Sequence, residues 1–274
     1  MTGSSDVSIV EVGPRDGFQS IAIQIPTEQK IDFIRRLYET GIRRFEATAF
    51  VSETAVPQLS DAAEVLTAAD ALSGLDAQVL VPNLRHAERA LAAGSNHLAF
   101  VLSASEKHNR SNVRRTPMES VEEYARIVEI LPEGTAMRLN IATAFDCPYD
   151  GPVAPQTTYD LLDALISIKS DAEICPCDTT GRVTPDRVAG FLAKARERYP
   201  QVKAWAYHGH DTYGLGLANV LAAWQSGVST IDASFAGLGG CPFAPGATGN
   251  VSTEDVAWMF MGMGISTGIN VPAL

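Results

Sequence analysis

The chain alternates short apolar, β-branched segments with amphipathic segments about eight times. Strands separated by helices pair in parallel, because the chain must cross over before each new strand. Eight such units in 274 residues match the size of a single (β/α)₈ barrel, the TIM-barrel fold. The expected strands are residues 7–12, 45–48, 77–81, 97–102, 136–142, 172–177, 202–207 and 230–233.

The alternative fold is a doubly wound sheet, which needs a glycine fingerprint after its first strand. Residues 13–17, Gly-Pro-Arg-Asp-Gly, do not supply one. We therefore expect one catalytic domain over residues 1–274, with residues 1–6 as a flexible tail. Thr27 is expected to cap a first helix, and Thr116 with Glu119 forms a capping-box pattern. A long polar loop is expected after the fourth strand.

Composition limits the classes of partner. The formal net charge is −11, which disfavours a nucleic-acid binder or a membrane-surface protein. No apolar run approaches the roughly 18 residues of a membrane span, and residues 1–8 lack the pattern of a secretory signal. Four cysteines in a chain of this length are too few for a disulfide framework, so we expect reduced thiols and a cytoplasmic protein.

Polar residues at the strand ends indicate a metal site. The active site of such a barrel lies at the carboxyl ends of its strands. His208 and His210 follow an apolar strand and, two residues apart, point to the same side. Together with Asp16 and Asn250 they would offer one carboxylate, two imidazoles and one amide oxygen. Such a set suits Mg²⁺, Mn²⁺ or Co²⁺ more than a closed structural Zn²⁺. The alternative is a pair of partly buried structural histidines.

Two further segments carry candidate chemistry. Cys241 lies among glycines and prolines, which favours an exposed thiol that acts as an acid or nucleophile. The alternatives are a buried small residue, or a loop that cradles phosphate. Lys107, Arg110 and Arg114 belong to the most basic stretch of the chain, which would suit the phosphates of a coenzyme or simply form a solvated loop.

These residues belong to longer motifs that resemble one known family, the 3-hydroxy-3-methylglutaryl-CoA lyases of the DRE-TIM metallolyase superfamily. The similarity runs from about Val7 to Leu274, and the segment around Cys241 is its most discriminating part. The motifs that carry it lie at residues 10–19, 50–52, 56–58, 81–84, 147–149, 178–181, 208–214, 236–244 and 249–255.

The resemblance implies a lyase that cleaves the C2–C3 bond of a 3-hydroxy-3-substituted acyl-CoA. The products are acetyl-CoA and a keto acid such as acetoacetate, as in leucine degradation. A divalent cation, Mg²⁺ or Mn²⁺ with Co²⁺ or Zn²⁺ as alternatives, would be held by Asp16, His208, His210 and Asn250. We also expect a homo-oligomer. Arg15 would stabilise the enolate, Cys241 would protonate it, and His208 or Asp16 would be the base, with support from Glu11, Gln19, Glu46, Asp178 and Glu254.

Three segments depart from residue types that are usual in the family, and all three are expected to face the acyl group or the coenzyme. They are residues 20–22, 140–143 and 175–177. The acyl group therefore stays open, with a longer-chain or citramalyl-CoA-like thioester as alternatives. A related synthase or aldolase that condenses a keto acid is a second hypothesis. A barrel that binds metal or coenzyme without turnover is a third.

Overall fold

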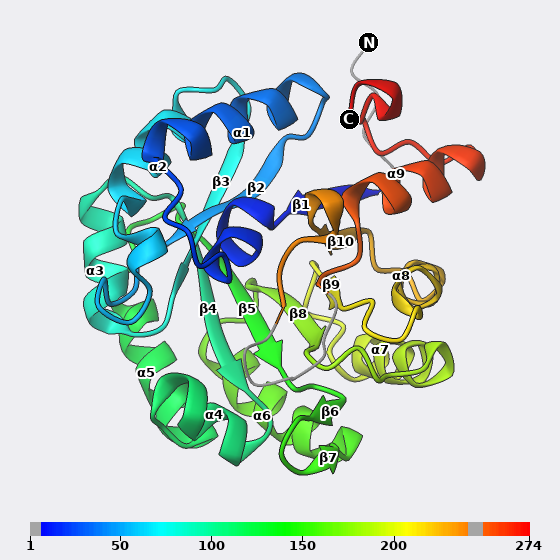
Figure 1. The fold of residues 1–274 in the computed structure, drawn as a ribbon. Helices are drawn as coiled ribbons and strands as arrows, with labels where there is room; N and C mark the ends of the chain where they lie inside the picture. The colour runs from blue at the N-terminus through cyan, green and yellow to red at the C-terminus, as the bar shows by residue number, and fades with distance from the viewer. Residues whose placement is uncertain (1–6, 241–248) are drawn as a thin grey trace.

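Eight parallel strands close into a barrel in the computed structural model, which describes residues 7–240 and 249–274 (Figure 1). The expected fold is therefore confirmed, whereas the expectation of a flexible tail at residues 1–6 falls outside the described residues. Around the barrel the strands follow the order β1-β10-β9-β8-β5-β4-β3-β2. Their bounds are Ser8–Glu11 (β1), Arg44–Ala49 (β2), Asp76–Val81 (β3), His97–Ser103 (β4), Ala136–Ala142 (β5), Glu173–Asp178 (β8), Ala206–Gly209 (β9) and Thr230–Ala233 (β10).

Helices form a ring outside the strands, as Figure 1 shows. A two-stranded antiparallel sheet of Asp146–Cys147 (β6) and Gly151–Pro152 (β7) follows β5. The helices are Thr27–Glu39 (α1), Ala62–Asp70 (α2), Leu84–Ala92 (α3), Glu106–Val113 (α4), Pro117–Glu129 (α5), Pro155–Ile168 (α6), Pro185–Arg198 (α7), Gly216–Gln225 (α8) and Thr253–Gly262 (α9). Shorter helical turns are Gly13–Gly17 (η1), Pro57–Leu59 (η2), Phe235–Gly237 (η3) and Val271–Ala273 (η4). No helix in the described part of the chain is long and apolar enough to span a bilayer.

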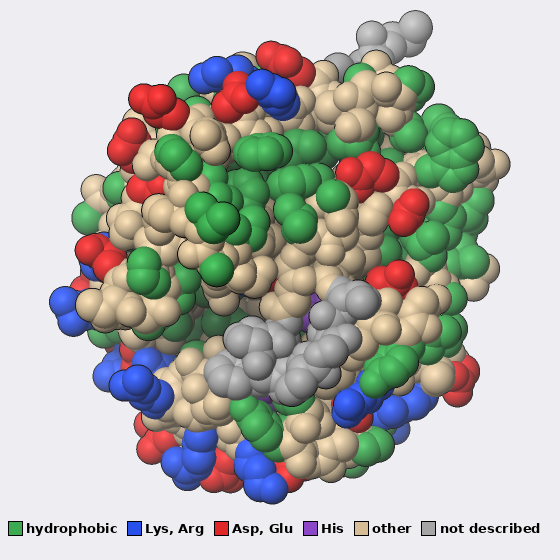
Figure 2. Space-filling model, viewed as in Figure 1, with side chains coloured by type: hydrophobic (Ala, Val, Ile, Leu, Met, Phe, Trp, Pro, Cys, Tyr) green, Lys and Arg blue, Asp and Glu red, His purple; other side chains and the backbone are tan. Residues whose placement is uncertain are grey.

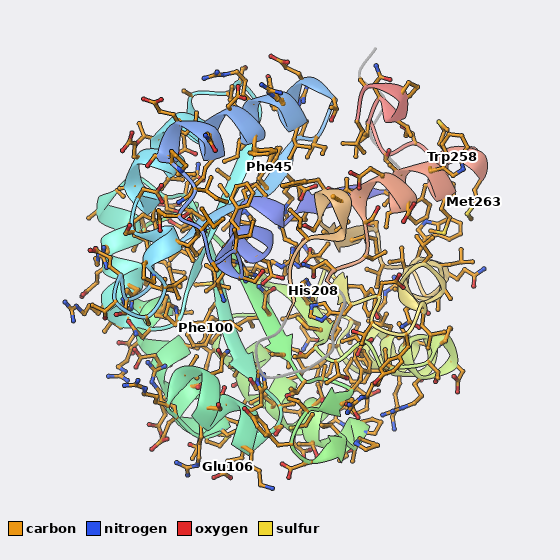
Figure 3. The ribbon with its side chains drawn as sticks, viewed as in Figure 1. Phe45, Phe100, Glu106, His208, Trp258 and Met263 are labelled. Carbon is orange, nitrogen blue, oxygen red and sulfur yellow. The ribbon has the colours of Figure 1, made fainter. Side chains whose placement is uncertain are left out.

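The apolar core lies between the barrel and its helices. Phe45 of β2 and Phe100 of β4 are fully buried in this layer, on the outer side of the sheet (Figure 3). The inner side of the sheet differs, because several of its buried side chains carry charge. They are Glu46, Arg138, Glu173 and Asp232, and the partly buried Arg44 lies beside them. Packing outside the sheet therefore holds the barrel together, and its interior is left for polar chemistry.

Two expectations about local structure are wrong. Thr27 is the first helical residue of α1 rather than its cap, and its hydroxyl donates to Asp61. The expected long loop after the fourth strand contains a helix, α4, whose N-cap is Ser105. The capping box of α5 is confirmed: Thr116 Oγ1 accepts from the amide of Glu119, and the Glu119 side chain accepts from the amide of Thr116.

The seventh strand lies later in the chain than its apolar pattern predicts. The expected range was 202–207, whereas β9 is Ala206–Gly209. Val202 closes a turn instead, since its amide donates to the carbonyl of Tyr199. Its side chain is buried in the core from that turn. His208 therefore lies within the strand and His210 directly beyond it.

Candidate metal centre

The chain turns back sharply after β1, and this turn places two candidate residues. The amides of Arg15 and Asp16 both donate to the carbonyl of Val12, which folds η1 over the end of its own strand. Glu11 stabilises the turn from below, because its carboxylate accepts from the amide of Gly13 at 2.8 Å. As a result, both Arg15 and Asp16 are buried at the mouth of the barrel.

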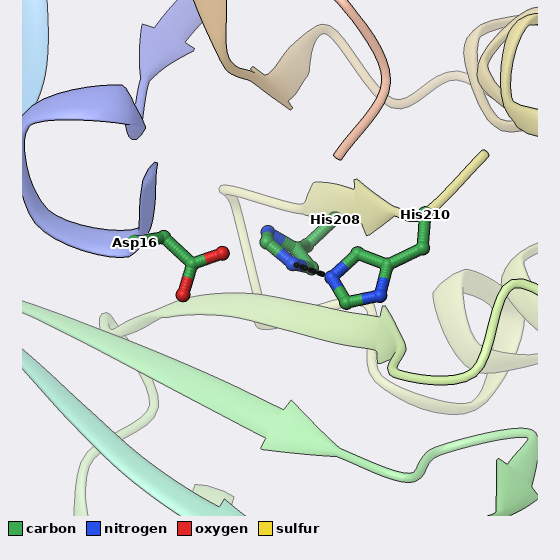
Figure 4. A group of neighbouring side chains, drawn as sticks. All are labelled: Asp16, His208 and His210. Carbon is green, nitrogen blue, oxygen red and sulfur yellow. Dashed lines mark hydrogen bonds between the residues drawn. The ribbon is translucent and has the colours of Figure 1, made fainter. Parts of the chain in front are cut away.

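Asp16, His208 and His210 form a buried group of potential metal ligands (Figure 4). Their ligand atoms all lie within 4.8 Å of one another. The Nε2 atoms of the two histidines are 3.3 Å apart. Two imidazole nitrogens at this distance need either a shared proton or a cation that both can contact.

Asn250 joins this group from the segment that follows β10, the strand between β1 and β9. It forms a β-bridge with His210, and its Nδ2 donates to Asp16 Oδ2 at 2.8 Å. The amide oxygen is buried, and the described residues offer it no hydrogen-bond partner. A buried oxygen without a donor is costly unless an ion or water satisfies it. A carboxylate, two imidazoles and this amide oxygen are a fitting donor set for a divalent cation.

Charges around the group differ between the two histidines. Burial opposes the protonation of His208, but Asp232, 3.0 Å from Nδ1, together with Cys177 and Asp16 outweighs it and raises the pKa of His208 to about 9. Burial and the neighbouring His208 lower the pKa of His210 to about 4. Burial also works against ionisation of Asp16, but Arg15 and the two histidines keep its pKa below the usual value. The group thus concentrates negative charge on Asp16, where a cation needs it.

Arg15 is held between two carboxylates. Its guanidinium pairs with Glu46 of β2 and donates from Nη1 to Asp16 Oδ1 at 2.6 Å. Burial alone would lower the pKa of Arg15, but the two carboxylates raise it above the usual value. This guanidinium is consequently a fixed positive charge beside the candidate ligands.

The other proposed supporting residues have different contacts. Glu11 accepts from the amide of Phe235 and from Thr253 Oγ1, so it ties η1 to the end of the barrel rather than to Arg15. Glu254 accepts from the amide of Ala236. Asp178 lies at the end of β8, where burial raises its pKa to about 7, against the effect of backbone amides from the next turn.

A cavity of about 760 Å³ opens beside the metal group. Arg15, Asp16, Gln19, His208 and His210 line one side of it. Another part of the lining is more apolar and comes from β3, β4 and the segments that follow β2 and β3. Its apolar residues include Val51, Ala55, Val56, Leu80, Pro82 and Val101.

The three basic residues expected to bind a coenzyme separate into two groups. Arg114 lines the cavity, in the left-handed backbone conformation that ends α4. Lys107 and Arg110 instead form exposed ion pairs with Asp150 and Glu106. Figure 2 shows lysine and arginine side chains gathered over α4 and α5 at this edge of the mouth.

Two interior residues were not found from the sequence. Asp232 supports His208, and Arg138 donates from Nη2 to both oxygens of Asp232 at 2.7 Å. The sequence marks each of them only as a charged residue within an otherwise apolar strand: Arg138 in residues 136–142 and Asp232 in residues 230–233. Cys241 lies outside the described residues.

Comparisons with known proteins agree with this geometry. The HMGL-like family model matches residues 6–274. The mitochondrial hydroxymethylglutaryl-CoA lyase of Bos taurus is 41% identical over 274 residues, all of this chain and 84% of that protein. The cytoplasmic 3-hydroxy-3-methylglutaryl-CoA lyase of Rattus norvegicus is 40% identical over 97% of this chain and 77% of that protein. The structure of an HMG-CoA lyase from Acinetobacter baumannii, in complex with coenzyme A and 3-methylmalate, superposes with a TM-score of 0.93 at 39% identity, covering 100% of this chain and 89% of that one.

Proposed function

The chain belongs to the HMGL-like family, and from that premise we propose that it is a divalent-metal-dependent carbon-carbon lyase. Its substrate is 3-hydroxy-3-methylglutaryl-CoA or a close 3-hydroxy-3-substituted acyl-CoA. The products are acetyl-CoA and a keto acid, acetoacetate for the first substrate. The observation that carries this proposal is the buried group of Asp16, His208 and His210 beside a cavity of about 760 Å³.

The reaction breaks one carbon-carbon bond and moves one proton. The C3 hydroxyl loses its proton, the C2–C3 electron pair passes to the thioester as an enolate, and C3 becomes a ketone. A proton then returns to C2 and gives acetyl-CoA. A divalent cation, Mg²⁺ or Mn²⁺ in our proposal, supplies a Lewis acid that lowers the pKa of the hydroxyl.

The residues of the chain supply the remaining parts. Arg15 lies beside the ligands as a fixed cation and stabilises the charge that develops on the enolate. His208 or Asp16 accepts the hydroxyl proton, since both border the cavity.

We propose Cys241 as the acid that protonates C2, on the strength of the sequence motif that contains it. A Cys241→Ser variant should lose about two to three orders of magnitude in kcat, because a hydroxyl is a much weaker acid than a thiol. Its affinity for Mn²⁺, measured by isothermal titration calorimetry, should match that of the wild type. Equal kcat in both proteins would rule out the acid role.

The coenzyme is proposed to lie along the edge of the mouth near α4. Arg114 borders the cavity there and is available for a phosphate. Lys107 and Arg110 would have to exchange their ion pairs with Asp150 and Glu106 for the ligand. Exposed ion pairs of this kind are weak, so such an exchange costs little.

Incubation with 3-hydroxy-3-methylglutaryl-CoA and Mg²⁺ or Mn²⁺ tests the function. Release of acetoacetate, abolished by EDTA and restored by the metal, supports the proposal. Condensation of acetyl-CoA with a keto acid and no cleavage would instead identify a synthase or aldolase. Saturable metal or CoA binding without any product would leave a binding protein.

A second candidate substrate is a 3-hydroxyacyl-CoA with a longer chain. The apolar wall that includes Val56, Leu80 and Val101 favours it, since this wall could cover more than a methyl group. A panel of hydroxyacyl-CoA thioesters, compared by kcat/KM, separates the two. A higher kcat/KM for the longer substrate would indicate that the apolar wall contacts the acyl chain.

Assembly and location complete the proposal. We propose a homo-oligomer, which size-exclusion chromatography with light scattering would detect. A cytoplasmic location is our proposal from the sequence, and the two curated relatives described above are cytoplasmic and mitochondrial.

A further inference from the structure

Asn140 occupies the inner side of β5, two residues beyond Arg138. Side chains two residues apart on a strand point the same way, so Asn140 lies directly above Arg138 in the barrel. Asn140 is 7% exposed and borders the cavity that contains Asp16 and His208. Its position is therefore at the floor of the proposed active site.

The orientation of the Asn140 amide is determined by Arg138. The Nε of Arg138 lies 2.8 Å from Asn140 Oδ1. A guanidinium only donates hydrogen bonds, so the atom that faces it must be the amide oxygen and not the nitrogen. The usual ambiguity between the two ends of an asparagine is thereby removed.

Asp232 and Glu173 hold the guanidinium in this position. Nη2 donates to both oxygens of Asp232, and Nη1 lies 3.2 Å from Glu173. Arg138 is itself 0% exposed, so its side chain has no room for another rotamer. The contact to Asn140 is consequently rigid.

The other end of the Asn140 amide, Nδ2, is a hydrogen-bond donor. With Oδ1 turned down toward Arg138, Nδ2 points away from it, toward the cavity. No hydrogen-bond acceptor for Nδ2 is found among residues 7–240 and 249–274. An N–H donor at a cavity wall is satisfied by water or by an acceptor atom of a bound ligand.

We propose that Asn140 is a substrate-binding residue whose Nδ2 donates a hydrogen bond to an oxygen of the acyl group. This inference rests on the proposed function. The acceptor is an oxygen of the thioester or of the acyl carboxylate, because both carry lone pairs and both lie in the part of the substrate that reaches the metal group. Arg138 thus aligns two sides of the site, His208 through Asp232 and the substrate through Asn140.

Two variants separate this role from a structural one. Asn140→Asp keeps an oxygen for Arg138 and removes the donor. Asn140→Leu removes both without adding charge. Each protein is assayed for kcat and KM with 3-hydroxy-3-methylglutaryl-CoA, for Mn²⁺ affinity by calorimetry and for its thermal midpoint.

We expect kcat/KM to fall by about 10- to 100-fold in both variants. This is the effect of removing one hydrogen-bond donor from an oxygen that carries negative charge or gains it in the transition state. Mn²⁺ affinity and the thermal midpoint of at least the Asp variant should remain those of the wild type. A loss confined to the Leu variant would show that Asn140 only supports Arg138. A loss confined to the Asp variant would show charge repulsion alone. Either result overturns the inference.

Failure of the proposed function has a different signature. In that case the wild type itself neither binds nor cleaves the thioester, and the inference falls with it. Cleavage by the wild type together with unchanged kinetics in both variants would refute the role of Asn140 alone.

Discussion

The carboxylate of Asp232 positions the ring of His208, and the guanidinium of Arg138 positions that carboxylate. Asp232 lies 3.0 Å from Nδ1 of His208, and two hydrogen bonds from Arg138 together with His208 overcome burial and lower the pKa of Asp232 to about 2. An ionised carboxylate on Nδ1 keeps a proton on that nitrogen, so a cation that displaces the second proton would bind at Nε2. Metal affinity should therefore depend on a residue that would not contact the metal.

An Asp232→Asn variant tests this dependence. The amide has nearly the same shape but no charge, so it holds the ring less strongly and lowers the basicity of Nε2. We expect Mn²⁺ affinity to fall by about 10- to 100-fold, as measured by calorimetry. Asp171→Asn serves as the control, because its side chain is 75% exposed and pairs only with Lys169 among the described residues. Equal affinity in all three proteins would contradict the role of Asp232.

His108 makes the stability of the protein depend on pH. Its ring is buried against Ser103 Oγ, and burial lowers the pKa of His108 to about 4. The unfolded chain takes up this proton near pH 6.5, so it binds more protons than the folded chain between about pH 6.5 and 4. Stability is therefore unaffected above this range and falls as the pH decreases through it.

A His108→Gln variant should show a weaker pH dependence. Urea unfolding at pH 7 and pH 4.5 would give a drop for the wild type that exceeds the drop for the variant by up to about 3 kcal/mol. The difference between the two proteins cancels the contribution of other titrating groups. Parallel curves would mean that His108 is protonated in both states alike.

At the scale of elements, η1 is the most constrained segment of the site. A Cβ on Gly13 would lie 2.5 Å from the ring of Phe235 and 2.6 Å from Glu11 Oε1. The ring cannot yield easily, because it packs against Phe18 and stacks on Phe33. Only glycine lets the chain turn here and bring Asp16 over the barrel.

Gly13→Ala should consequently damage the site. The added methyl group pushes η1 outward and moves Arg15 and Asp16 away from His208. We expect a fall of at least about 10-fold in both Mn²⁺ affinity and kcat/KM. Gly190→Ala is a matched control, because a Cβ there meets nothing within 4 Å and the helix gains about 0.5–1 kcal/mol. A fully active Gly13→Ala protein would show that η1 has room to adjust.

The sequence predicted elements well where apolar residues repeat, and poorly elsewhere. The strand at residues 136–142 and the capping box at Thr116 were found, since each has a local signal. Helix α4 was missed because its buried side chains are His108 and Asn109, so no apolar periodicity marks it. Tertiary contacts leave no such signal. Arg138 donates a hydrogen bond to Asp232, 94 residues later in the chain, and only the register of the closed barrel brings the two together.

Across the whole molecule, a network of buried and partly buried charges links several strands. Glu173 of β8 accepts two hydrogen bonds from Arg44 of β2, at 2.8 and 2.9 Å, and lies 3.2 Å from Arg138 of β5. Buried ion pairs contribute little net stability when complete, but they are costly to break because an unpaired charge remains. The barrel is therefore sensitive to the loss of any one member.

Glu173→Gln should reduce the free energy of unfolding by about 3–5 kcal/mol, since two guanidinium groups lose their shared carboxylate. Urea unfolding measures this directly. The control is Asp32→Asn on the surface of α1, where the pair with Arg36 is exposed and its loss costs less than about 1 kcal/mol. A similar small effect in both variants would show that water reaches the network.

The outer and inner sides of the barrel sheet have different functions. Aliphatic and aromatic groups on the outer side keep the molecule folded, whereas the groups that recognise and transform a ligand project inward from the same strands. Asn140 and Cys177 line the cavity and lie outside the aliphatic and aromatic layer, so a change at either position alters the lining without repacking that layer. A barrel of this kind can acquire a new substrate selectivity through substitutions in the cavity lining, while the apolar layer outside the strands stays the same.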